Sequence, residues 1–222
     1  MTQISIKKAV AKQSRLSGKI QTKPVYEFLK RCMDVTGAAL GLMMLLPVLC
    51  VVSVMIKLDS PGPVFFVQKR TGHRGKVFSM YKFRSMCPDA EKMRNQYLDQ
   101  NEADGPIFKM THDPRVTKVG KWIRKTSVDE LPQLWNVLNG TMSLVGPRPL
   151  PTYEQAECTE EQAKRLLVKP GMTGMWQTNG RSDTSFEEMI ALDLQYIERR
   201  SLWTDLKIIW ATFGSVFGKG AY

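Results

Sequence analysis

The chain has 222 residues, enough to bury one core with an appended segment but too few for two full domains. Its 32 Lys and Arg residues exceed its 21 Asp and Glu residues, and the net charge of +11 indicates an anionic partner. Nucleic acid, an acidic membrane surface and a phosphorylated substrate all fit that charge. With only two histidines and four cysteines that form no CxxC pair, the composition argues against His-rich metal sites, a Ser-His pair and disulfides.

Residues 1–24 are polar and basic, and we predict a flexible tail that lies against anionic lipid headgroups. A membrane segment is predicted at 25–58. Within it, Val35–Ile56 carries no charged residue and would reach about 33 Å as a helix, enough to cross a hydrocarbon core of about 30 Å. The alternatives are a buried helix of a soluble protein, for which the segment is long, and a cleaved signal peptide. The long basic region before the segment and the lack of a small-residue cleavage site after it argue against a signal peptide.

Pro47 divides this apolar segment into two limbs of about 18 Å and 14 Å, each about half of a hydrocarbon core. Residues 1–31 and residues 57–84 are both strongly basic, with one acidic residue in each. Since positively charged flanks prefer the cytoplasm, both ends of the segment are expected on that side. We therefore predict a re-entrant helix hairpin that turns at Pro47, in preference to a single crossing.

The rest of the chain, 59–222, is predicted to be a small cytosolic α/β catalytic domain associated with the membrane, which makes the whole chain α+β. Hydrophobic periodicity and turn residues predict strands at 64–67 and 77–83, a turn at 72–75, and helices at 88–100, 129–139 and 186–199.

An apolar stripe follows near the C-terminal end of the sequence. Its members recur at spacings of three and four residues, which places them on one face of a helix. The stripe can pack in a core, or it can lie in the membrane interface as an amphipathic helix. Its members are Trp203, Leu206, Trp210, Phe213 and Phe217.

Asp129 and Glu130 are adjacent carboxylates at the start of the predicted helix 129–139. Ser127 and Glu130 match a capping box, in which both acids would serve only the helix end. Pro132 favours Asp129 as the N-cap, because the proline then falls in the first turn, where its missing N–H is not needed. In that register Asp129 lies among free backbone N–H groups, which favour its ionised form and a nearby phosphate.

Five basic residues stand in motif-like contexts before and after these acids. A guanidinium fork suits phosphate oxygens, and a Gly/Pro context holds such a fork in place. A solvated surface position is the alternative for each of them. These candidate phosphate-binding residues are Lys82, Arg84, Arg124, Arg148 and Arg181.

Taken in order, these motifs resemble the bacterial sugar transferases of the monotopic polyprenyl-phosphate phosphoglycosyl transferase family, which start exopolysaccharide, capsule and O-antigen repeat units. The resemblance leaves only the N-terminal tail outside. Met175-Trp176 departs slightly from the family's usual pair at that place. The matching segments are Lys30-Arg31, Asp34, Pro47, Gly62–Phe65, Lys82–Met86, Asp113–Arg115, Asp129–Leu131, Val145–Pro149, Pro170–Gly174 and Gly180-Arg181.

The resemblance implies that Asp129 is a nucleophile that attacks the β-phosphate of a UDP-sugar, expels UMP and carries the sugar phosphate. It implies that Glu130 is the partner of Asp129 and that the two hold Mg²⁺, a hard ion that suits a chain without a His/Cys cluster. It also implies polyprenyl (undecaprenyl) phosphate as the acceptor, basic side chains near the phosphates, and a site at the cytoplasmic leaflet of the bacterial inner membrane. Whether the protein forms a homodimer is left open by the sequence.

Two other functions compete with this prediction. A non-catalytic monotopic adaptor that binds acidic lipid or a partner protein accounts for the charge and the hairpin. It leaves the Asp129-Glu130 pair and the Gly/Pro-framed arginines unexplained. A nucleic-acid binder conflicts with the membrane segment and lacks a recognised binding motif, so no nucleic-acid partner is predicted.

Overall fold

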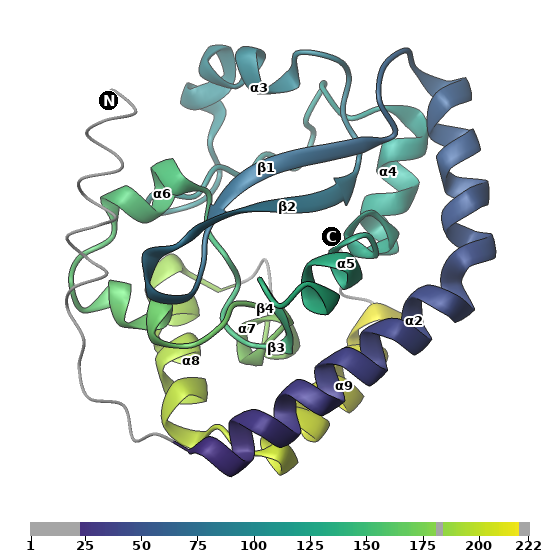
Figure 1. Ribbon diagram of the computed structural model, residues 1–222. Coiled ribbons are helices and arrows are strands. Elements are labelled where there is room, and N and C mark those ends of the chain that lie inside the picture. Colours follow the sequence, from purple (N-terminus) through teal and green to yellow (C-terminus); the bar gives the residue numbers. More distant parts are fainter. Residues whose placement is uncertain (1–22, 181–183, 218–222) are drawn as a thin grey trace.

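The computed structural model describes residues 23–180 and 184–217, so the predicted tail falls almost wholly outside the described residues, and Arg181 does too. The first element is helix α2, Pro24–Asp59, which begins with a proline in its first turn. In the described part of the chain it is the one helix long and apolar enough to cross a membrane. Figure 1 shows it running along one edge of the domain and then turning along a second edge.

Pro47 lies inside α2 and does not end it. The structure therefore corrects the prediction of two separate helical limbs: the segment is one bent helix, not a pair of antiparallel helices (Figure 1). A proline removes one backbone hydrogen bond and crowds the preceding turn, which is the usual cause of such a bend.

Strands β1 (Phe65–Thr71) and β2 (Val77–Phe83) form an antiparallel hairpin around the short 3₁₀ helix η1 (His73–Gly75). This matches the predicted second strand and turn, while β1 is longer than the predicted first strand. Phe78 and Met80 point from β2 into a core shared with α2 and with helix α5 (Gln133–Leu138). The hairpin thus shares one core with α2 and α5.

Two glycines let α2 lie close against the domain. A Cβ atom on Gly37 would come within 2.8 Å of the Leu144 side chain, and one on Gly41 within 3.2 Å of Leu134. Larger side chains at these positions would push α2 away from α5 and from strand β3 (Ser143–Val145). The helix is therefore shaped to pack on this domain along one side.

The remaining elements confirm the predicted mixture of helices and strands. The predicted helix 186–199 is α8, and the predicted helix 88–100 is divided into α3 and a 3₁₀ helix. Strands β3 and β4 pair in parallel. The bounds are α3 Ala90–Met93, η2 Arg94–Gln100, α4 Lys118–Lys125, η3 Val128–Glu130, β3 Ser143–Val145, α6 Thr152–Glu157, η4 Gln162–Leu167, β4 Gly171–Thr173, α7 Met175–Thr178, α8 Phe186–Arg199 and α9 Leu202–Phe217.

Helix α9 carries the apolar stripe of the sequence. Trp203 and Trp210 are 66% and 82% exposed, whereas Asp205 and Ile208, on the other face of α9, are buried. Core packing of the stripe is therefore wrong, and the membrane-interface alternative remains. The side chain of Phe217 lies outside the described part of the structure.

Candidate active site

Asp129 and Glu130 lie in the 3₁₀ helix η3, between α4 and α5. Ser127 precedes it in a left-handed conformation, at φ 55°, and its side chain makes no capping hydrogen bond, so the capping box does not form. The alternative register, with Asp129 as N-cap of the following helix, is also wrong. Pro132 itself occupies the N-cap of α5, because a proline cannot supply an N–H further inside the helix.

The two carboxylates differ in their contacts. Oε1 of Glu130 accepts a hydrogen bond from Nζ of Lys82 at 2.7 Å and lies 3.5 Å from Nη1 of Arg148. Asp129 is 9% exposed and makes no hydrogen bond or ion pair with any residue that the structure describes. Glu130 is thus neutralised by its neighbours, while Asp129 is left for another partner.

The electrostatic surroundings separate the two acids further. Burial raises the pKa of Asp129 to about 6; Lys82 and Arg124 oppose this shift and Glu130 adds to it. Burial also acts to raise the pKa of Glu130, but Lys82 and Arg148 outweigh it and hold that pKa at about 2. Near neutral pH both groups are ionised, and Asp129 is the more basic of the two.

Three of the predicted basic residues gather around these acids. Lys82 comes from β2, Arg124 from α4, and Arg148 from the loop after β3. Each of them lowers the pKa of Asp129, which places their charges within its electrostatic reach. The structure therefore brings Lys82, Arg124 and Arg148 to one place.

Arg84 lies in a different environment. Its buried guanidinium donates to the carbonyl and hydroxyl oxygens of Ser60, at 2.7 and 3.1 Å, and to the carbonyl oxygen of Pro61. It joins the end of β2 to the chain that leaves α2, so the structure gives Arg84 a role in holding the membrane helix. Arg181 lies outside the described residues.

Arg70 was missed by the sequence analysis. It lines a small pocket with Lys82, Glu130 and Arg148, and its Nη1 donates to the Pro149 carbonyl at 2.8 Å. Burial and Arg148 lower the pKa of Arg70 to about 10, so the side chain keeps its charge at neutral pH.

A signal for Arg70 is present in the hairpin pattern. In the observed register Phe66 faces Lys82 and Arg70 faces Phe78, so Arg70 and Lys82 project from the same face. Had the predicted first strand, 64–67, been extended to residue 70, the alternation of side chains would have placed Arg70 and Lys82 on one face of the hairpin.

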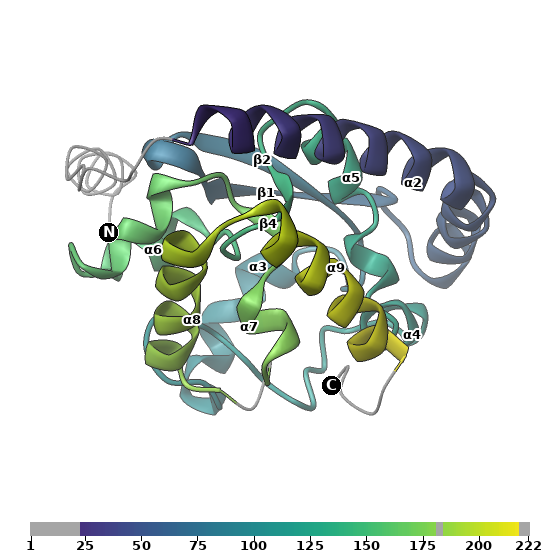
Figure 2. The same ribbon diagram turned by 90° about the horizontal axis from the view of Figure 1, so that it is seen from below.

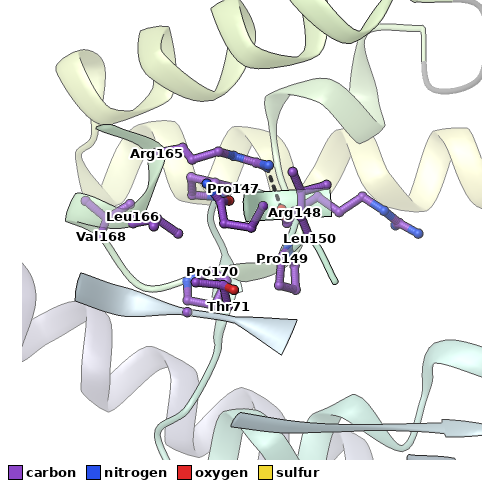
Figure 3. Close-up of a pocket in the computed structure, with 11 residues that line it drawn as sticks. Thr71, Pro147, Arg148, Pro149, Leu150, Arg165, Leu166, Val168 and Pro170 are labelled. Atoms are coloured by element: carbon purple, nitrogen blue, oxygen red, sulfur yellow. Dashed lines mark hydrogen bonds between the residues drawn. The ribbon is translucent and has the colours of Figure 1, made fainter. Parts of the chain in front are cut away.

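A second small cavity lies behind the loop that carries Arg148 (Figure 3). Arg165 donates to the Arg148 carbonyl oxygen there, and it forms a buried ion pair with Asp193 at 2.5 Å. The Arg148 side chain points away from this cavity in Figure 3. Arg165 therefore supports the loop from behind, on the side opposite to the carboxylates.

Asp129 and Glu130 supply two adjacent oxygen donors. Elsewhere in the described part of the chain, no group of three His, Cys, Asp or Glu side chains converges to hold an ion. Mg²⁺ is commonly bound by one or two carboxylates together with substrate phosphates and water. The pair therefore fits Mg²⁺ bound jointly with a diphosphate substrate, not a metal cage made by the protein alone.

The fold and the site define a membrane-associated domain in which two adjacent carboxylates lie among several cations. The chain belongs to the bacterial sugar transferase family, whose sequence profile matches residues 25–219. The family that the sequence motifs indicated is thereby confirmed.

Three relatives illustrate the match. The chain is 48% identical to the galactosyl transferase CpsE of Streptococcus agalactiae, over 86% of this chain and 43% of that protein. It is 43% identical to the UDP-glucose:undecaprenyl-phosphate glucose-1-phosphate transferase of Escherichia coli, over 89% and 42%. It is 36% identical to the exopolysaccharide production protein ExoY of Rhizobium meliloti, over 90% and 91%. The chain thus spans less than half the length of the first two relatives and nearly all of the third.

Proposed function

We propose that this protein transfers a hexose-1-phosphate from a UDP-sugar to undecaprenyl phosphate and releases UMP. This would be the first membrane step of exopolysaccharide, capsule or O-antigen synthesis. The observation that carries the proposal is Asp129, a buried carboxylate that bonds to no described side chain, next to a neutralised Glu130 and among cations. Relatives named as galactosyl and glucose-1-phosphate transferases support a UDP-hexose as the donor.

Binding of the donor follows from the surplus of positive charge. Arg70, Lys82, Arg124 and Arg148 provide four cations against two carboxylates. Arginine forks and a lysine ammonium bind phosphate oxygens well, so the diphosphate would occupy the pocket beside Glu130. Mg²⁺ held by Asp129 and Glu130 would neutralise charge on the diphosphate and on the departing UMP.

In the first step, an oxygen of Asp129 attacks the β-phosphorus. An oxygen–phosphorus bond forms to Asp129, and the bond from the β-phosphorus to the bridging oxygen breaks, so UMP leaves with both bonding electrons. A carboxylate is a weak nucleophile, but with a pKa of about 6 Asp129 needs no general base near neutral pH. Glu130 is less suited to attack because it is bonded to Lys82.

In the second step, an oxygen of the lipid phosphate attacks the same phosphorus. The bond to Asp129 breaks and the carboxylate returns, which leaves a polyprenyl diphosphate sugar. The water-soluble donor and the lipid acceptor need not bind at the same time. Two-step kinetics are therefore expected.

The contacts at both ends of α2 support a re-entrant segment. Near its start, Arg31 donates to the carbonyls of Val137 and Leu138 at 2.7 Å. At its end, Asp59 accepts a hydrogen bond from the Val119 N–H at 3.0 Å. A helix whose two ends both bind one small domain does not place that domain on two sides of a bilayer. With the basic flanks, this supports a catalytic domain on the cytoplasmic face of the inner membrane.

Exposed apolar side chains indicate which surface meets the lipid. Along the middle of α2, Met43 and Met44 are 68% and 76% exposed, and α9 exposes Trp203 and Trp210. Figures 1 and 2 show the first part of α9 beside α2. Tryptophan favours the membrane–water interface, so α9 would lie in that interface while the middle of α2 enters the acyl region.

A UMP-release assay tests the function. Purified protein in vesicles with undecaprenyl phosphate is given UDP-glucose, UDP-galactose and N-acetylated UDP-sugars in turn. We expect UMP from at least one hexose donor. Without the lipid acceptor, sugar-labelled donor should leave a hydroxylamine-sensitive acyl phosphate, which mass spectrometry places on Asp129. Binding to vesicles with no UMP from any donor would favour the non-catalytic adaptor instead.

Cysteine labelling tests the topology. In a cysteine-free background, Val10→Cys and Pro63→Cys lie before and after α2, and Pro63 is exposed. Both are expected to react only with a reagent that has reached the cytoplasmic side. Reaction of either one from the periplasmic side of intact cells would exclude the re-entrant topology.

A further inference from the structure

The side chain of Arg148 lies between a carboxylate and an aromatic ring. Its Nη1 is 3.5 Å from Oε1 of Glu130, and its guanidinium carbon lies 5.3 Å from the centre of the Trp176 ring. This distance is typical of a cation held over an aromatic ring. Trp176 belongs to α7, an element that carries none of the predicted catalytic residues.

The indole of Trp176 is itself fixed on two sides. Its Nε1 donates to Oγ1 of Thr184 at 2.6 Å. The ring also packs against the core cluster that contains Leu150 and Phe186. A ring with both a hydrogen bond and apolar packing is a rigid surface for a long, flexible arginine side chain.

The Trp176 ring adds a second support to the Arg148 guanidinium, whose contact with Glu130 is long. At 3.5 Å the ion pair lies beyond the usual range of a strong charge-assisted hydrogen bond. The Arg148 backbone is held from behind by Arg165, but that contact does not set the direction of the guanidinium. A planar fork must point correctly to meet phosphate oxygens in pairs.

We propose that Trp176 is a positioning residue for phosphosugar transfer. Its indole face, anchored by Thr184, keeps the Arg148 guanidinium aimed at the donor diphosphate beside Asp129. This inference rests on the proposed function and adds a residue that acts through Arg148 without touching the reacting atoms.

The test is a double-mutant cycle on UMP release. Trp176→Leu removes the aromatic face and keeps an apolar side chain. We expect its kcat/KM to fall about tenfold in the wild-type background. In the Arg148→Gln background the same change should cost less than twofold, because the group that Trp176 positions is already gone.

Milder variants separate positioning from packing. Trp176→Phe keeps an aromatic face and should recover most of the activity lost in Trp176→Leu. Thr184→Val removes the anchor of the indole and should lower kcat/KM by about threefold. Thr178→Val is the matched control, and it should leave kcat/KM unchanged, since the Thr178 hydroxyl on α7 donates to backbone carbonyls of its own helix and accepts only from the adjacent Asn179 side chain. Melting temperatures of all variants show whether they fold.

Two results would overturn the inference. One is an equal loss from Trp176→Leu with and without Arg148, which means that Trp176 only packs. The other is a loss in Trp176→Phe as large as the loss in Trp176→Leu, together with wild-type kcat/KM in Thr184→Val. If the wild-type protein releases no UMP from any donor, the proposed function itself fails. If the wild-type protein is active but the effects of Trp176 and Arg148 substitutions are independent, only the positioning role fails.

Discussion

The protein contains two buried polar clusters that differ in how fully their charges are bonded. At the junction of α2, α8 and α9, Asp205 is fully buried and accepts hydrogen bonds from Lys30 at 2.9 Å, Tyr26 at 3.0 Å and Tyr196 at 2.8 Å. In the candidate active site, Asp129 is buried to a similar degree but bonds to no described side chain.

The two clusters also differ in how well their positive and negative charges balance. At the junction, one lysine balances one aspartate, and the tyrosine hydroxyls complete the hydrogen bonding of that aspartate. A buried pair of this kind holds elements in place and leaves nothing for a ligand. Among the residues that the structure describes, the site has more cations than carboxylates and one carboxylate that bonds to no side chain. Binding of an anion would balance these charges. Buried charges that do not balance therefore distinguish the candidate active site from the structural cluster at the junction.

The largest loss of activity that tests this difference between the clusters is expected on substitution of Asp129. Asp129→Asn keeps the size of the side chain and removes the attacking charge, so UMP release should fall by a factor of at least about 1,000. Glu130→Gln should lower activity less while still allowing label to accumulate on Asp129. Melting curves should show both variants folded. Label on Glu130 in the wild-type protein would reverse the two roles.

Metal removal should be the next largest effect. A diphosphate donor and the departing UMP carry charge that a divalent ion commonly neutralises. Excess EDTA should reduce UMP release by about 100-fold or more, and Mg²⁺ should restore it. The melting temperature should not change, because the bonded junction needs no ion. Full activity in EDTA would contradict the expected use of Mg²⁺.

A substitution in the junction should affect stability and spare catalysis. Asp205→Asn leaves the Lys30 ammonium buried without its counter-charge, which costs about 3–5 kcal/mol for a buried pair. We expect a lower melting temperature and lower yield, with kcat/KM of the folded fraction close to wild type. A variant that melts like wild type but releases no UMP would remove the distinction between the two clusters.

The sequence predicted those parts of the fold that depend on local pattern. The hairpin turn at 72–75, strand β2 and helix α8 follow from turn residues and periodicity. The start of α5 did not, because both registers considered for Asp129 assumed an unbroken helix there. The left-handed conformation of Ser127 and the position of Pro132 produce a separate 3₁₀ turn.

Site residues could be predicted where the residue type and its sequence motif indicate the role. They could not be predicted where the role depends on a tertiary contact. Adjacent acids and Gly/Pro-framed arginines identified Asp129, Glu130 and Arg148. Arg84 stands in an equally motif-like context, yet its partners are backbone oxygens near Ser60, a choice made by tertiary packing. Trp176 was noted only as part of a pair that departs from the family pattern, and its contact with Arg148 was not predicted, because that contact joins segments that only the fold brings together.

The smallest predicted effect concerns Glu154 of α6, a buried acid that belongs to neither cluster. Glu154 is 6% exposed, and its carboxyl group makes no hydrogen bond or ion pair with a described residue. Burial raises its pKa from 4.5 to about 7, although Arg70 and Arg94 oppose the shift. Folding therefore favours the protonated acid, and the folded state holds a proton that the unfolded chain releases between about pH 4.5 and 7.

Because the folded pKa of Glu154 lies above the unfolded one, this group makes the protein less stable as the pH rises through that window. Its contribution is at most about 3 kcal/mol. Glu154→Gln cannot ionise, so its loss of stability between pH 5 and pH 8 should be smaller than that of wild type. Glu157→Gln, at an exposed position on the same helix, is the matched control and should behave like wild type. Urea unfolding in detergent at the two pH values measures the difference. An unchanged pH slope in Glu154→Gln would mean that Glu154 is already ionised in the folded protein at pH 5, which contradicts a raised pKa.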